Sequence, residues 1–266
     1  MRPSLRLGSG PPLVLLPPAQ GDAAWLEPLA RALASDFDVL VVQTRGELLD
    51  SDGALLTLDE HVEHARRDMA AAGMARTAVL GSSFGGLVAL GLALDHPETV
   101  ERLVLHATTA RLRDHALTLR LGRMLPSPWV RAQLLHALAA IGGSRELLAL
   151  DGMELRELLR LAWSLRARRT PPSALMARVE VFAEADLEPR LPEIACPTLI
   201  VSGEEALDAL VPPRSQRALR ELIPGARTAV LPRSGHFGVV TRPAALADLV
   251  RPFLLEGTPP RPAETA

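Results

Sequence analysis

The chain has 266 residues, of which 48% are hydrophobic, and a formal net charge of −2. This length suffices for one large domain with a substantial core and an inserted subdomain. The near-neutral charge without a basic block argues against a nucleic-acid partner, and the single cysteine, Cys196, excludes an internal disulfide. The apolar runs have the length of strands, so we expect no membrane span and a cytoplasmic location.

Short apolar runs alternate with segments of helical periodicity along most of the chain. The predicted strands are residues 13–16, 37–42, 77–80, 102–105, 198–201 and 228–231. The predicted helices are residues 23–34, 57–72 and 84–94, with further helices after the last two strands. Thr57 and Glu60 have the spacing of a capping box at the start of the second helix. This alternation predicts an α/β fold, with a mostly parallel, doubly wound sheet covered by helices on both faces.

One long segment, residues 111–190, interrupts this alternation. It is rich in Leu and Arg, has helical spacing without a convincing strand, and is divided by prolines. We therefore expect residues 111–190 to be a helical lid inserted into a core of residues 1–110 and 191–256. The last residues, 257–266, are polar and rich in proline, which predicts a disordered tail.

The sequence VLGSSFGGLV, residues 79–88, places two serines between a predicted strand and a predicted helix. Ser83 is the central residue of a G-x-S-x-G pattern, in which Gly81 and Gly85 leave room for a sharp turn. Such a turn exposes the hydroxyl of Ser83 at the N-terminus of the helix, where the amides and the dipole favour an oxyanion. We expect Ser82, one residue earlier, to point elsewhere.

A serine nucleophile needs a base and an orienting acid, which follow later in the chain of such folds. His236 lies in the sequence RSGHFG, a glycine-flanked loop after the last predicted strand, and is the candidate base. His61 and His64 lie three residues apart on a predicted helix, where we expect a solvated face and not a metal pair. The candidate acids all follow the strand 198–201: they are Glu204, Glu205 and Asp208.

These motifs resemble those of the α/β-hydrolase superfamily, in its lid-bearing, esterase-like branch, over nearly the whole chain. GSSFGG resembles the nucleophile elbow, IACPTLIVSGEEALDALVPP the acid loop and LPRSGHFGVVTRPAALADLVRPFL the histidine loop with the final helix. The resemblance implies that Ser83 is the nucleophile and His236 the base. The family's aspartate usually stands three residues before a Val-Pro, which implies Asp208 as the acid. The spacing from Gly203 is longer than usual, so Glu205 remains an alternative.

A second departure concerns the oxyanion hole. Where the family usually has His-Gly after its first core strand, this chain has Pro17-Pro18-Ala19. Proline has no N–H to donate, so the resemblance implies that the amide of Ala19 or Gln20 acts with that of Phe84. Loss of one such donor costs about 3 kcal/mol of transition-state stabilisation.

The resemblance implies a serine hydrolase that cleaves an ester, thioester, lactone or C–C-linked ketone of a small apolar molecule through an acyl-enzyme. It implies no cofactor and no metal, and the only expected partner is the small-molecule substrate. Two alternatives remain at this point. One is a non-hydrolytic lyase, cyclase or acyltransferase of a biosynthetic pathway, and the other is a catalytically quiet binding protein. The oligomeric state is left open.

Overall fold

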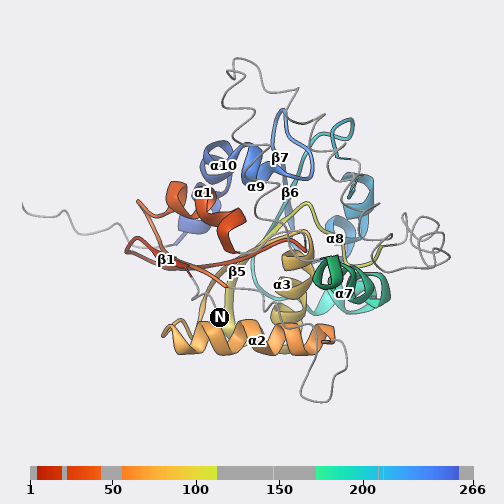
Figure 1. Cartoon of the computed structure of the whole chain (residues 1–266), viewed down its shortest axis with the longest axis horizontal. Helices are drawn as coiled ribbons and strands as arrows, with labels where there is room; N and C mark the ends of the chain where they lie inside the picture. The colour runs from red at the N-terminus through yellow and green to blue at the C-terminus, as the bar shows by residue number, and fades with distance from the viewer. Residues whose placement is uncertain are drawn as a thin grey trace, which may run out of the picture.

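The computed structural model describes residues 5–19, 23–42, 56–112, 146, 172–208, 210–211 and 213–257. Its centre is a seven-stranded sheet with the order β1-β3-β2-β4-β5-β6-β7 (Figure 1). The strands are β1 (Leu5–Leu7), β2 (Pro12–Leu16), β3 (Asp38–Val41), β4 (Thr77–Ser82), β5 (Val100–His106), β6 (Thr198–Ser202) and β7 (Arg227–Val230). Only β1 runs antiparallel to its neighbour, and the remaining pairs are parallel. The predicted fold class is confirmed.

Helices cover both faces of this sheet. On one face lie α2 (Leu58–Ala71), α3 (Phe84–Asp95) and α8 (Arg217–Leu222), and on the other lie α1 (Ala23–Leu33), α9 (Gly238–Thr241) and α10 (Pro243–Leu255). The side chains of β2 show the alternation: Val14 and Leu16 join the core under α3, whereas Leu13 and Leu15 join the core under α1. The central strands of the sheet are therefore buried between two layers of helices, whereas the edge strand β7 is largely exposed.

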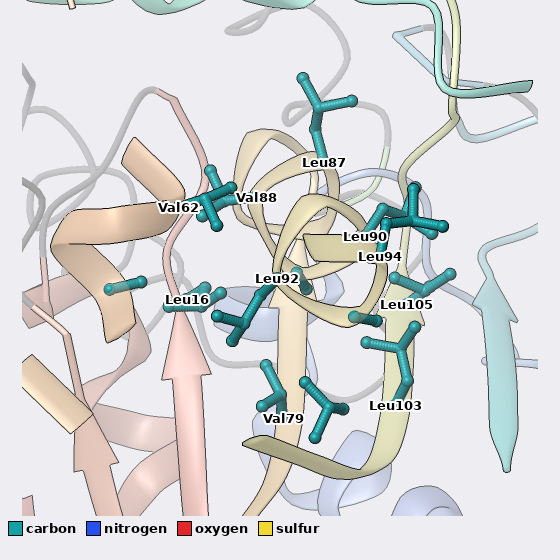
Figure 2. Close-up of a cluster of buried hydrophobic side chains, with 14 of the residues drawn as sticks. Leu16, Val62, Val79, Leu87, Val88, Leu90, Leu92, Leu94, Leu103 and Leu105 are labelled. Carbon is teal, nitrogen blue, oxygen red and sulfur yellow. The ribbon is translucent and has the colours of Figure 1, made fainter. Parts of the chain in front are cut away.

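The helix α3 is central to the first of these cores. All its residues from Phe84 to Leu94 are buried, and Figure 2 shows Val88 on the side of α2 and Leu90 and Leu94 on the side of β5. The neighbouring helix α2 begins with the predicted capping box, in which Glu60 N donates to Thr57 Oγ1 and the Glu60 carboxylate accepts from Thr57 N. This packing fixes the start of α3 at the carboxyl edge of β4.

The described structure adds one strand to those predicted. β1 has three residues and pairs with β3, and Arg6 at its centre forms an ion pair with Asp38. Three residues are too short for an alternating pattern to stand out in the sequence. The other strands agree with the prediction to within a few residues.

Parts of the predicted lid and tail lie outside the described residues. Within the predicted lid, the structure describes residues 111–112, Glu146 and the stretch from 172 onward, which forms α7 (Pro172–Glu184) and the 3-10 helix η2 (Glu188–Glu193). Residues 258–266 of the predicted tail are not described. Among the helices of the described ranges, none combines the length and the apolar character that a bilayer crossing requires.

Candidate active site

Ser83 occupies a strained turn between β4 and α3. Its backbone has φ 53° and ψ −118°, a combination that is rare for a residue with a side chain. Two hydrogen bonds hold this conformation: Ser83 N donates to His106 O over 2.9 Å, and Thr108 Oγ1 donates to Ser83 O over 2.7 Å. In this turn the Ser83 hydroxyl lies 3.0 Å from His236 Nε2.

The glycines of the motif allow the close approach that the turn requires. A Cβ added to Gly81 would collide with the carbonyl oxygen of Gly85, and one added to Gly85 would collide with the carbonyl oxygen of Leu16. It would also lie 2.7 Å from the carbonyl oxygen of Pro17. The backbone after β2 and the start of α3 are thus in direct contact.

We expect Gly85→Ala to lower the free energy of unfolding by about 1–3 kcal/mol, because the backbone of Leu16 and Pro17 must move to admit the methyl group. Urea denaturation measures this loss. Gly73→Ala is the control, since no atom lies within 4 Å of its added Cβ and only its φ of +76° is unfavourable. Equal stability of Gly85→Ala and the parent chain would contradict the close packing of this turn.

The structure brings Ser83, His236 and Asp208 into line. His236 Nε2 lies 3.0 Å from Ser83 Oγ, and its Nδ1 lies 3.5 Å from Asp208 Oδ1. All three side chains are buried. Asp208 Oδ1 also accepts from the backbone amides of Leu210 and Val211, at 3.0 and 2.8 Å. The gap between imidazole and carboxylate is longer than a hydrogen bond, as is common in such sites before a substrate is bound.

The loop with the candidate acids and the loop with His236 are packed against each other. Glu204 N donates to Ser234 O, and Arg233 N donates to Glu204 Oε1, each over 2.7 Å. A Cβ added to Gly235 would lie 2.5 Å from the carbonyl oxygen of Leu207. Glu204 therefore holds the histidine loop by its backbone and is not the residue that faces the imidazole.

Glu205, the alternative acid, lies at the surface. Its side chain is 51% exposed and forms an ion pair with Arg214. The structure thus places Asp208 beside His236, the candidate base, and Glu205 beside Arg214. The two residues are only three positions apart, so the sequence spacing alone could not separate them.

The segment Pro17-Pro18-Ala19 follows β2 and lies against the turn of Ser83, through the contact of Leu16 and Pro17 with Gly85. Ala19 is buried, and its carbonyl oxygen accepts a hydrogen bond of 3.0 Å from Arg178 Nη1 of α7. Arg178 itself is 3% exposed. The buried guanidinium of Arg178, from the predicted lid, thus binds the segment that we expect to contact the oxyanion. Nothing in the sequence pattern predicts this contact.

A small, mostly apolar cavity lies beside this segment, lined among others by Pro17, Phe84, Val88 and His61. The prediction of a solvated face is wrong for His61, whose side chain is buried with its ring edge-on to that of Phe84, the two ring centres lying 5.0 Å apart. The predicted helix was correct, but the tertiary packing of α2 on α3 decides which side is covered.

Two histidines near the site are held neutral. Burial lowers the pKa of His61 to about 4, and the charge of Arg178 contributes. Burial lowers the pKa of His106 to about 3, with a further contribution from the charge of His236. His106 Nδ1 lies 3.0 Å from Ser82 Oγ, so the hydroxyl of Ser82 is bound away from the base, as expected.

These two histidines predict a loss of stability in acid. Their pKa values are near 6.5 in the unfolded chain and far lower in the folded one, so between these values the unfolded state binds more protons. The free energy of unfolding should therefore decrease as the pH falls below about 6.5, by up to about 1.4 kcal/mol per unit for each histidine. Urea denaturation at several pH values measures the slope. His61→Leu should reduce this slope, and an unchanged slope in His61→Leu would contradict the assignment.

Within the described ranges, no three His, Cys, Asp or Glu side chains are grouped in a way that could hold a metal ion. The arrangement of Ser83, His236 and Asp208 can activate a hydroxyl as a nucleophile without one. Such an arrangement is suited to acyl transfer, in which an imidazole accepts and then returns a proton.

Comparison with known proteins agrees with the fold of this chain. The sequence profile of the alpha/beta hydrolase family matches residues 13–249. The chain is 30% identical, over 93% of its length and 91% of the relative's, to "Putative carbamate hydrolase RutD" of Klebsiella pneumoniae (strain 342). It is 33% identical, over 66% of its length and 56% of the relative's, to the pimeloyl-[acyl-carrier protein] methyl ester esterase of Neisseria meningitidis serogroup A. The enol-lactonase from Burkholderia xenovorans LB400 superposes with a TM-score of 0.76 and 26% identity, over 95% of both chains.

Proposed function

This chain belongs to the alpha/beta hydrolase family, and from that premise we propose that it is a serine hydrolase that cleaves an ester or related acyl bond of a small apolar substrate. The observation that supports this most directly is the 3.0 Å separation between Ser83 Oγ and His236 Nε2. The chain is an enzyme of hydrolase type, and the assignment of these residues as its catalytic machinery is our proposal.

In the proposed mechanism, Ser83 Oγ attacks the acyl carbon while His236 Nε2 accepts the hydroxyl proton. The Asp208 carboxylate faces Nδ1 of His236, where it orients the imidazole ring and stabilises the imidazolium. The amides of Ala19 and Phe84 donate to the oxyanion. His236 returns the proton to the leaving group, which departs and leaves an acyl-enzyme. Water then attacks the acyl carbon with His236 as base, and the acid is released with Ser83 regenerated.

The names of the similar proteins indicate which class of bond is cleaved. They are named for a carbamate, a methyl ester and an enol-lactone, all of which have an acyl carbon bonded to a heteroatom leaving group. The mostly apolar cavity beside Phe84 favours a small apolar substituent next to that carbon. We also propose that residues 111–190 are a lid over this site, and that the protein works in the cytoplasm, where a free thiol such as Cys196 persists.

Labelling with a fluorophosphonate tests the proposal. We expect the parent chain to gain the mass of one adduct, mapped to the peptide that contains Ser83, and the folded Ser83→Ala variant to gain none. An adduct on another residue would contradict the assignment of the nucleophile.

The segment Pro17-Pro18 is the observation that favours a non-hydrolytic enzyme on this scaffold, because it replaces residues that normally precede an oxyanion donor. That alternative predicts a folded parent chain that takes no adduct and turns over no activated ester. Efficient turnover of several esters would exclude it.

A further inference from the structure

Glu146 is the one residue between 113 and 171 that the structure describes, and its side chain is buried. Its carboxylate accepts three hydrogen bonds, all from residues close to His236 in the chain. Ser234 Oγ donates to Oε1 over 2.8 Å, Phe237 N donates to Oε2 over 2.9 Å, and Thr241 Oγ1 donates to Oε1. Glu146, a residue of the predicted lid, therefore accepts hydrogen bonds from residues that precede and follow His236, the proposed base, in the chain.

A buried carboxylate is costly unless its oxygens are bonded. Three donors from one short segment satisfy Glu146, and removal of the acceptor would leave the buried Phe237 amide without its partner. The contact thus constrains both the carboxylate and the backbone that surrounds it.

The segment from Arg233 to Thr241 is held from two sides. Toward the acid loop, Arg233 N donates to Glu204 Oε1, and toward the predicted lid, Phe237 N donates to Glu146 Oε2. The Phe237 ring packs edge-on against His236, with centres 5.4 Å apart, and also against Trp25. A shift of the Phe237 backbone would therefore move the imidazole relative to Ser83.

We propose that Glu146 is a positioning residue, which fastens the base-bearing loop to the predicted lid and so holds His236 Nε2 at Ser83 Oγ. Its consequence for turnover rests on the proposed function, whereas the contact itself does not. Glu146 then contributes to the geometry of the catalytic groups.

Two variants of Glu146 distinguish the effect of its hydrogen bonds from the effect of its charge. Glu146→Leu keeps a similar volume and removes every acceptor, whereas Glu146→Gln keeps an acceptor for the Phe237 amide. With an activated ester, we expect Glu146→Leu to lower kcat by about 10- to 100-fold, because small displacements of a catalytic group have effects of this size. Its KM should change little, and Glu146→Gln should recover most of kcat. Glu193→Leu, a change at an exposed partner of Arg190, is the matched control.

Active-site titration and thermal unfolding of each variant correct kcat for any fraction that is not folded. A Glu146→Leu variant with kcat within twofold of the parent chain would overturn the positioning role. An equal fall in the Glu193→Leu control would overturn it too, because the effect would then not depend on the contact with the histidine loop.

Two nuclear magnetic resonance measurements require no turnover. In the parent chain we expect slow hydrogen exchange at the Phe237 amide and a single ring tautomer of His236, with the proton on Nδ1. In Glu146→Leu we expect faster exchange and a mixture of tautomers. If the parent chain takes no fluorophosphonate, the proposed function fails, but these measurements still decide the inference. Unchanged exchange would show that the contact is absent, and an unchanged tautomer would show that it does not position the ring.

Discussion

Ser83→Ala is expected to reduce kcat for an activated ester by about 10⁵- to 10⁶-fold, the range found when the nucleophile of a serine triad is removed. The reason is the loss of the covalent route, since no other described hydroxyl lies at His236 Nε2. The remaining activity would come from the oxyanion donors and from substrate binding. Steady-state kinetics with a chromogenic ester measure the change, and circular dichroism verifies that the variant is folded.

The neighbouring serine provides a matched control. Ser82 has the same hydroxyl on the adjacent residue, but that hydroxyl is buried against His106. Ser82→Ala should therefore keep kcat within a few-fold and cost about 1 kcal/mol of stability for the lost hydrogen bond. A large loss of kcat in Ser82→Ala together with retained turnover in Ser83→Ala would reverse the assignment of the two serines.

The elements that could be predicted from the sequence are those with a local signal. The strand 77–80 and the helix 84–94 differ in apolar pattern and are joined by glycines, so the turn at Ser83 follows from the local chemistry. The capping box at Thr57 and Glu60 is likewise complete within four residues. The Leu5–Leu7 strand has no such signal, because its pairing with β3 is a contact with residues more than thirty positions away.

The contacts around the site depend on tertiary packing and leave little trace in the sequence. His61 is covered because α2 packs on α3. Arg178 and Glu146 come from the Leu- and Arg-rich segment 111–190, and each is buried against a loop of the site. A charged residue that is buried by a distant partner has the same local pattern as one that faces water.

The structure distinguishes the two candidate acids, which the sequence spacing could not do. Glu205 and Asp208 lie in one loop, three positions apart, so the sequence alone does not show which of them faces His236. The folded loop turns Asp208 inward, where two backbone amides bind its Oδ1, and turns Glu205 outward to Arg214. Backbone hydrogen bonds of this kind keep a carboxylate in one orientation, as an orienting acid requires.

Asp208→Asn should accordingly lower kcat by about 10⁴-fold, because an amide group at this place favours the wrong tautomer of the base and offers no charge to the imidazolium. KM should change much less, since Asp208 is not expected to touch the substrate. The matched control is Glu205→Gln, which makes the same chemical change in the same loop and should leave kcat within twofold. If Glu205→Gln were the inactive variant, the loop would have to refold when substrate binds, and Asp208 would be a structural residue that anchors the loop through the Leu210 and Val211 amides.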